Sequence, residues 1–172
     1  MSSILSSYTT DQIANLTTQE ISALLTSDIV VLNSDQIAAL TSTQVAVFSS
    51  MQIGAITTSV LPSLTTADFA AINTNALGGL TTAQTKALTT DQIVALTTAQ
   101  AGILSTQQVG ALSTDGMAAM QTADFAALKT SAIAILSTNQ VKALTTDQIV
   151  ALTSAEAAAL SSAQVAALST DA

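Results

Sequence analysis

The stretch LTTDQIVAL, at Leu88–Leu96 and again at Leu144–Leu152, contains the pattern on which the whole chain is built. Looser copies, such as NSDQIAAL from Asn33 and SSAQVAAL from Ser161, fill most of the remaining sequence. A repeat that runs through a chain fixes the architecture before any single residue does. We therefore divide the 172 residues into octads, each of which ends at a residue number divisible by eight.

The eight positions of an octad, here called slots one to eight, differ in chemistry. Slot eight is large and apolar in every octad, from Tyr8 to Leu168, and slot five is apolar in nearly all of them. Slot seven is mostly Ala and slot four is most often Gln. Slot two is Ser or Thr from Thr10 to Thr170, whereas slot one usually carries a hydroxyl but also becomes Leu25.

A second, longer period lies above the octad. The hexapeptide TADFAA begins at Thr66 and recurs at Thr122, seven octads later. The same spacing separates Lys86 from Lys142. The sequence therefore predicts a lead-in followed by a single solenoid built from three blocks. The lead-in is 1–8, the solenoid is 9–172, and the blocks are 9–64, 65–120 and 121–172.

The octad pattern predicts an all-α fold rather than strands. The abundant Thr, Val and Ile favour strands, so a β-solenoid is the alternative. A half-buried strand needs alternating apolar and polar residues, and the octad does not alternate. One continuous helix also fails, because eight residues overshoot two helical turns by about 80° and the apolar stripe would circle the helix. The expected fold is a solenoid of about twenty very short capped helices.

The hydroxyl pairs supply the breaks between these helices, since Ser and Thr are preferred N-cap residues. In TTDQ, Thr89 could form a capping box with Gln92, or Thr90 could be the cap. We favour slot two as the general cap because its hydroxyl is always present. A helix of about six residues is unstable alone in water and must stack on its neighbours, here through slots five, seven and eight. Pro62 predicts that octad 57–64 is the least regular.

Two other slots have predicted roles. We expect the slot-four glutamines to satisfy backbone groups at the breaks, or to form a ladder along the stack. Lys86 and Lys142 place slot six on the outer face, where glycines at this slot indicate tolerance or close approach of an adjacent coil.

Composition excludes several functions. The net charge is −8 with only three Lys and no Arg, which disfavours binding to nucleic acid or to anionic membranes. No apolar run approaches the roughly 18 residues that a membrane-spanning helix needs. With no Cys and no His, there are no disulfides, no Ser-His-Asp triad and no His-metal site. We predict no catalytic residue, no metal ligand, no cofactor and no enzyme activity.

The remaining conspicuous residues have structural explanations. The acidic side chains of slots three and four are expected in first helical turns, where the helix dipole favours anions. The GG pair at Gly78–Gly79 lacks the other residues of a phosphate loop, and NLT at Asn15–Thr17 is a chance match to a glycosylation acceptor. The phenylalanines are expected to fill the core; they are Phe48, Phe69 and Phe125. The acidic residues are Asp11, Glu20, Asp28, Asp35, Asp68, Asp91, Asp115, Asp124, Asp147, Glu156 and Asp171.

Two resemblances arise from these motifs. LTTDQIVAL at Leu88–Leu96 resembles the opening helix of TAL-effector repeats. The base-reading loop, the second helix and the basic residues of those repeats are absent, so DNA reading does not carry over. From Thr9 onward the chain also resembles the octapeptide Ser/Thr-rich tracts of large exported bacterial proteins with adhesion-like character. That resemblance implies an extracellular or cell-surface location, although MSSILSSYTT at residues 1–10 is not a secretory signal peptide.

The function expected from the sequence is structural. Near-total repetition without a site predicts a scaffold or spacer of an exported or surface-attached bacterial protein, with self-association through the solenoid ends. The alternative is a solenoid binding module for a peptide, a glycan or a surface, whose binding residues and ligand are unknown. The third class is ice or surface binding through columns of Thr.

Overall fold

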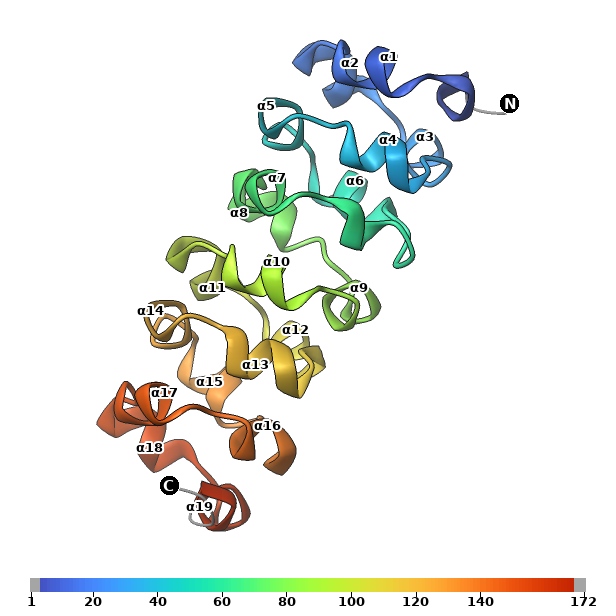
Figure 1. Cartoon of the computed structure of the whole chain (residues 1–172). Helices are drawn as coiled ribbons and strands as arrows, with labels where there is room; N and C mark the ends of the chain where they lie inside the picture. The colour runs from blue at the N-terminus through green and yellow to red at the C-terminus, as the bar shows by residue number, and fades with distance from the viewer. Residues whose placement is uncertain (1–3, 169–172) are drawn as a thin grey trace. The chain divides into compact units, whose positions relative to one another are not determined.

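The computed structural model of the chain describes residues 4–168, and within that range all regular secondary structure is helical. Nineteen short α-helices and two 3₁₀ helices follow one another in these residues, with no strand among them (Figure 1). The predicted fold class is therefore confirmed. The β-solenoid alternative is not supported by the described residues.

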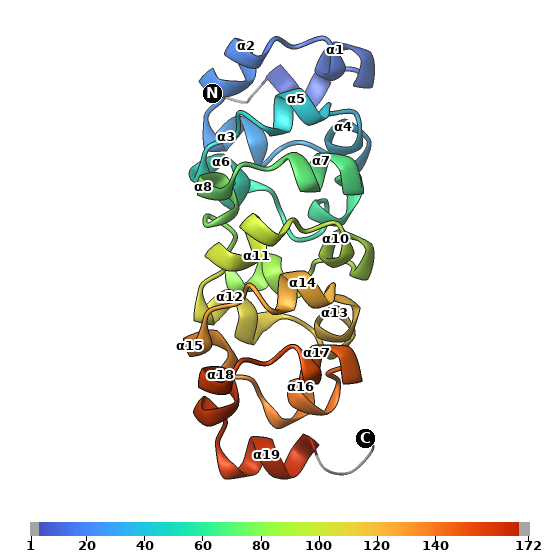
Figure 2. The same ribbon diagram turned by 90° about the vertical axis from the view of Figure 1, so that its left-hand side faces the viewer.

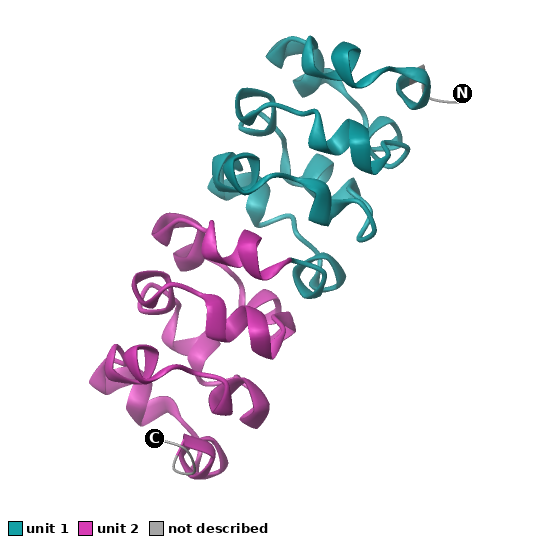
Figure 3. Ribbon diagram, viewed as in Figure 1, with its two compact units in different colours: residues 1–88 teal, residues 89–172 magenta. Residues whose placement is uncertain are grey.

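The chain divides into two compact units, residues 1–88 (unit 1) and 89–172 (unit 2), coloured separately in Figure 3. The organisation of 9–172 as one solenoid of three blocks stays a prediction. The described helices of unit 1 are η1 Ile4–Ser7, α1 Thr10–Ala14, α2 Thr18–Ala23, α3 Thr26–Ile29, α4 Ser34–Ala38, α5 Ser42–Val45, α6 Ser50–Ala55, η2 Leu61–Ser63, α7 Thr66–Ala71, α8 Thr74–Leu77 and α9 Thr82–Lys86. Those of unit 2 are α10 Thr90–Val94, α11 Thr98–Ile103, α12 Thr106–Ala111, α13 Thr114–Ala119, α14 Thr122–Phe125, α15 Thr130–Ile133, α16 Thr138–Lys142, α17 Thr146–Val150, α18 Ser154–Ala159 and α19 Ser162–Leu168.

The N-cap position of each of α1 to α18 is slot one, and the preference for slot two was wrong. Leu25, Gln121 and Lys129 occupy this position without a side-chain cap bond. In α10 the N-cap is Thr89, with extended backbone (φ −76°, ψ 159°), and its side chain accepts from the backbone N–H of Gln92. Slot two is the first helical residue. The geometry explains the choice, because an N-cap hydroxyl bonds the N–H three residues on, and slot four lies three residues after slot one.

The core of each unit consists of slots five and eight. Slot-five side chains such as Ile37 and Ile133 are completely buried, and slot-eight side chains such as Phe48 are nearly so. Phe69 and Phe125 are buried in slot five, which confirms that the phenylalanines fill the core. Small helices packed on a thin aliphatic core need close backbone approach, which Leu, Ile, Val and Ala permit.

The third set of buried positions is slot four rather than slot seven. Slot-seven residues such as Ala39 and Ala111 are half-buried at the rim of the core. Glutamines in slot four, such as Gln92 and Gln148, are 1% and 0% exposed. Polar side chains are buried at this depth only when their hydrogen bonds are satisfied, so slot four must hold a polar network inside the stack.

Octads stack on octads of the next turn. A helix packs against the helix of the third octad after it, as α3 does on α6 and α6 does on α8 in unit 1. In unit 2, α12, α15 and α18 follow one below another in the same way (Figure 2). Each short helix thus gains from its neighbours the stability that it lacks alone.

Octad 57–64 is the irregular one, as Pro62 predicted. It is the octad without an α-helix within residues 9–168, and contains only η2, with Pro62 in its first turn. Leu61 and Leu64 nevertheless keep their core positions, at 0% and 2% exposed. The stack therefore tolerates a lost helical turn as long as slots five and eight stay filled.

Candidate functional site: the glutamine ladder and its open end

The amide of a slot-four glutamine serves two helices at once. In Gln148, Oε1 accepts from the backbone N–H of Thr145, the cap of its own helix, at 2.9 Å. Its Nε2 donates to the carbonyls of Met117 and Met120 in the preceding turn, at 2.9 and 2.8 Å. Those carbonyls lie at the C-terminal end of α13, where a helix leaves acceptors without intrahelical partners. The glutamine thus joins the start of one helix to the end of another.

The spacing of these bonds, together with the packing of the helices, limits the length of a superhelical turn. Nε2 of Gln84 donates to carbonyls 31 and 28 residues earlier, at Ile53 and Ile56. Helices pack on helices three octads away, whereas the glutamine amide reaches the end of the fourth octad back, so a turn takes between three and four octads. A turn of three and a half octads would put seven octads in two turns, which is the longer period seen in the sequence. The printed distances show the same spacing at Gln36, Gln44, Gln52, Gln140, Gln148 and Gln164.

Aspartate in slot four uses a different partner. The shorter side chain of Asp68 accepts a hydrogen bond from the slot-two hydroxyl of Ser42, 26 residues earlier, at 2.7 Å. Asp124 accepts in the same way from Thr98 at 2.8 Å. The second oxygen of Asp68 is bonded by the Thr65 hydroxyl. The equivalent Oδ2 of Asp124 is buried without a partner, because slot one of its octad is Gln121.

We expect Gln121→Thr to raise the free energy of unfolding of unit 2 by about 1 kcal/mol, since a Thr hydroxyl would reach Asp124 Oδ2 as Thr65 reaches Asp68. The exposed bond from Gln121 Nε2 to the Val94 carbonyl would be lost, at small cost. Urea denaturation followed by far-UV circular dichroism measures the change. Gln121→Ala is the control and should not stabilise the unit; an equal gain in both variants would contradict the explanation.

Glutamate in slot four keeps the cap but lacks the donor. Glu20 and Glu156 have the same capping geometry, in which Oε2 accepts from the backbone N–H and the hydroxyl of Thr17 or Thr153, each at 2.8 Å. Their surroundings differ. Glu156 is 4% exposed, inside the stack of unit 2, whereas Glu20 is exposed. The donation from Thr17 lowers the pKa of Glu20, so this carboxylate is ionised at neutral pH and accepts hydrogen bonds only.

Glu156→Gln is expected to stabilise unit 2 by roughly 1–2 kcal/mol, because an amide would donate to carbonyls that a carboxylate repels. By the ladder spacing these are the carbonyls of Phe125 and Leu128. Thermal unfolding of the two Gln variants provides the measurement. The matched control is Glu20→Gln, which makes the same change of charge in the same capping box without an earlier described turn beneath it. Equal stabilisation by both would point to net charge instead of the ladder.

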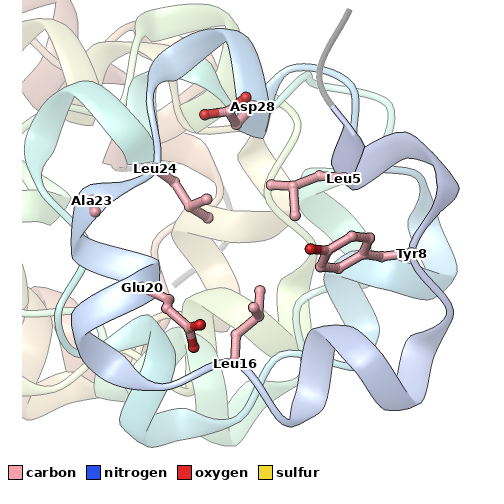
Figure 4. Close-up of a pocket in the computed structure, with 7 residues that line it drawn as sticks. All are labelled: Leu5, Tyr8, Leu16, Glu20, Ala23, Leu24 and Asp28. Atoms are coloured by element: carbon pink, nitrogen blue, oxygen red, sulfur yellow. The ribbon is translucent and has the colours of Figure 1, made fainter.

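The N-terminal end of unit 1 is where the ladder is open. Gln12 and Glu20, the slot-four residues of α1 and α2, are exposed instead of buried. Beside Glu20 lies a hollow of about 320 Å³. Figure 4 shows the apolar side chains facing a common space, with the two carboxylates at its edge. The residues that line it are Leu5, Tyr8, Leu16, Glu20, Ala23, Leu24 and Asp28.

At the C-terminal end of unit 2, residues in core slots are partly exposed. Val165, in slot five, is 50% exposed, and slot-eight Leu160 is half-buried, although both slots are core positions elsewhere. No later turn within residues 4–168 supplies an amide to the carbonyls of Leu152 and Leu160. Within the described residues, the carbonyls of the last turn of unit 2 therefore differ from those of the earlier turns in receiving no ladder amide.

The structure places the acidic residues singled out by sequence in first helical turns. The slot-three residues Asp11, Asp35, Asp91, Asp115 and Asp147 are exposed there. In slot four, Asp68 and Asp124 bond a hydroxyl of the preceding turn, a turn-to-turn role that the sequence analysis considered only for glutamine. The hydrogen bonds of Glu20, Asp28 and Glu156 lie within their own octads. Asp171 lies outside the described residues. Within residues 4–168, no group of three or more His, Cys, Asp or Glu side chains could hold a metal ion.

The other singled-out residues do not converge on a site. Lys86 and Lys142 are exposed in slot six, as expected for the outer face. Asn15 is exposed at the end of α1, where its Nδ2 donates to the Asp11 carbonyl at 2.7 Å. Among the glycines, the closest approach to another turn is at Gly79 in slot seven. The sequence analysis missed it because it considered close approach only for the slot-six glycines. No helix of the described range is long and apolar enough to cross a membrane.

A comparison with protein families identifies the repeat. A family model described as the ALTTAQ repeat matches residues 21–58, 29–66, 61–98 and 117–154. The six letters of that description are written in this chain at Ala95–Gln100, which run from slot seven to the ladder glutamine of slot four. No curated protein matches the chain. The matches together span 21–98 and 117–154, well over half of the sequence, and the chain belongs to the ALTTAQ repeat family.

Proposed function

We propose that the chain is a structural spacer in an exported or surface-attached bacterial protein, and that it assembles end to end. The observation that carries the proposal is the glutamine ladder, which repeats one turn-to-turn interface at a fixed spacing of 28 and 31 residues. An interface that recurs at a fixed spacing lets a tract grow by adding octads, and the stability of a solenoid is then approximately a sum of similar terms.

The surface supports the same role. Slots two and three put Ser, Thr and a few carboxylates on the outside of the described helices, so a long tract stays soluble with little charge. Location outside the cell rests on the resemblance to octapeptide tracts of exported proteins. The binding-module and ice-binding alternatives remain sequence-based predictions. Against a free Thr array, slot-one hydroxyls such as those of Thr89 and Thr145 accept the capping N–H bonds.

The spacer role is tested by changing the number of octads. One variant lacks block 65–120 and another carries it twice, and small-angle X-ray scattering gives the maximum dimension of each chain. A spacer gains the same length with each added block. A maximum dimension that grows only as the cube root of the chain length would overturn the proposal.

Location is tested separately in the organism that encodes the chain. Antibodies against the purified 172-residue chain should label intact cells or the culture medium. Labelling that appears only after lysis would overturn the assignment to the cell surface or exterior.

A further inference from the structure

We infer that slots six and seven form size-matched pairs between turns, and that these pairs fix which octad packs on which. Each pair consists of a slot-six residue and the slot-seven residue 25 positions later, here called an outer pair. The inference concerns the contact between neighbouring turns within a unit, so it stands independently of the proposed spacer function.

Slot-six glycines in unit 2 show the contact directly. A Cβ on Gly110, in α12, would lie 3.1 Å from Cδ1 of Ile135, which follows α15. A Cβ on Gly102, in α11, would lie 3.4 Å from the carbonyl oxygen of Ala127 and 4.0 Å from its Cβ, after α14. The helices concerned also pack on each other, α12 on α15 and α11 on α14. Slot six of one turn therefore faces slot seven of the next.

The same contact occurs in unit 1, between two glycines. A Cβ on Gly54 would lie 3.0 Å from the carbonyl oxygen of Gly79, again 25 residues later. Neither residue of this pair has a side chain, and the backbones themselves come close together. The outer pair is thus a packed contact whose space the two residues share.

The side chains at these positions have complementary sizes throughout the sequence. Each Val or Ile in slot seven follows, 25 residues earlier, a Ser or Gly in slot six. These pairs are Ser6 with Val31, Ser22 with Val47, Gly78 with Ile103 and Gly110 with Ile135. Conversely, each Val, Pro or Lys in slot six precedes an Ala wherever the later position lies within the sequence. These pairs are Val30 with Ala55, Pro62 with Ala87, Lys86 with Ala111, Val94 with Ala119 and Lys142 with Ala167. Sizes that compensate in this way are typical of packed positions, where total volume must be kept.

The outer pairs distinguish octads that the core does not. Slots five and eight are apolar in nearly every octad and slot four is most often Gln, so these slots barely separate one octad from the next. Slots six and seven vary more. A turn displaced by one octad would bring Val30 against Val47 in place of Ser22, and two β-branched side chains would fill the space of one. The outer pairs therefore disfavour displaced turns, as features that exclude alternative packings do.

The contact is tested by disulfide formation, because the chain has no Cys. Gly102→Cys with Ala127→Cys puts two Cβ atoms 4.0 Å apart, a separation that a disulfide spans. We expect this bond to close within the monomer on mild oxidation, as measured by protection from alkylation. The controls pair Gly102→Cys with Ala119→Cys or Ile135→Cys, one octad earlier or later, and should stay reduced. Equal closure in all three variants, or none in the first, would overturn the pairing.

The size rule is tested at Gly110. Gly110→Val is expected to raise the equilibrium constant for unfolding by about tenfold or more, because the added methyl groups would meet Ile135. In the Ile135→Ala background the same substitution should be close to neutral, since slot six carries Val94 where the partner is Ala. The matched control is Gly102→Val, which should be close to neutral in the unmodified chain because its partner is Ala127. Urea denaturation read by far-UV circular dichroism gives the constants.

The coupling between the two positions decides the outcome. An equal loss from Gly110→Val in both backgrounds would overturn the size rule. An equal loss from Gly102→Val would also overturn it, since the cost would then belong to valine in slot six itself. If Gly110→Val does not fold, the double variant with Ile135→Ala must regain the helical spectrum. None of these results bears on the spacer function, which the scattering of chains with different numbers of blocks decides.

Discussion

Gly79→Ala is expected to lower the free energy of unfolding of unit 1 by about 3 kcal/mol, at the upper end of the usual cost of overpacking. A Cβ at this position would lie 2.2 Å from the Ser50 carbonyl oxygen and 2.7 Å from the Ser50 Cα and carbonyl carbon, all of them backbone atoms. Backbone at the start of α6 cannot rotate away as a side chain can, so two turns must separate. No described glycine has positive φ, so the cost comes from the close approach and not from backbone conformation.

The adjacent glycine is the matched control. A Cβ on Gly78 would have its nearest neighbour at 3.4 Å, and its backbone is α-helical (φ −59°, ψ −18°). Gly78→Ala is therefore expected to be neutral or to stabilise unit 1 by up to about 1 kcal/mol, through a less flexible unfolded chain. Urea denaturation of both variants, read by far-UV circular dichroism, compares them directly. Equal effects at the two positions would contradict the close approach of the Gly79 turn to α6.

Gln148→Ala is expected to cost unit 2 roughly 3–5 kcal/mol, because it leaves buried carbonyls at Met117 and Met120 without their donor and removes the acceptor for the Thr145 N–H. The Gln12 side chain is exposed, and its oxygen accepts a capping bond from the Thr9 N–H at 2.9 Å. Gln12→Ala removes only this bond. That loss should be about 1 kcal/mol or less. The difference between the two free energies of unfolding measures the turn-to-turn bonds.

A second substitution at the same position separates hydrogen bonding from volume. Gln148→Glu keeps the size of the side chain and the acceptor for Thr145, and replaces only the donating nitrogen. We expect a loss comparable with that of Gln148→Ala. If Gln148→Glu is as stable as the unmodified chain, the amide donor is not what joins the turns, and the explanation offered for Glu156 fails with it.

The sequence predicted the fold class and most of the core, since octad periodicity excludes both a strand and a long helix. It also placed the irregular octad at Pro62. The predicted N-cap in slot two was wrong. The constant presence of a hydroxyl in slot two says less about capping than the three-residue distance from slot one to slot four, which is the distance that a capping bond spans. In slot two the hydroxyl has a different use in two octads, where Ser42 and Thr98 donate to slot-four aspartates of the next turn.

The length of the turn could have been obtained from the sequence, but was not. If a turn takes three and a half octads, two turns take seven octads. Seven octads are then the shortest stretch after which an octad returns to the same place in a turn. The 56-residue recurrence of Lys86 at Lys142 carried that information. The open end could not be predicted in this way, because Glu20 looks like any capping glutamate until the exposure of its octad is known.

The half-octad offset between turns also constrains how genes for such tracts can change length. Recombination between nearly identical octads adds or removes any number of them, but a gain of one octad shifts every downstream residue relative to the turn that it packs on. Pairs such as Asp68 with Ser42 survive within a gained segment of seven octads, since each side chain then meets the same neighbour as before. We expect alleles of this tract to differ mostly in steps of 56 residues, with single-octad changes confined to regions where slot four is uniformly glutamine.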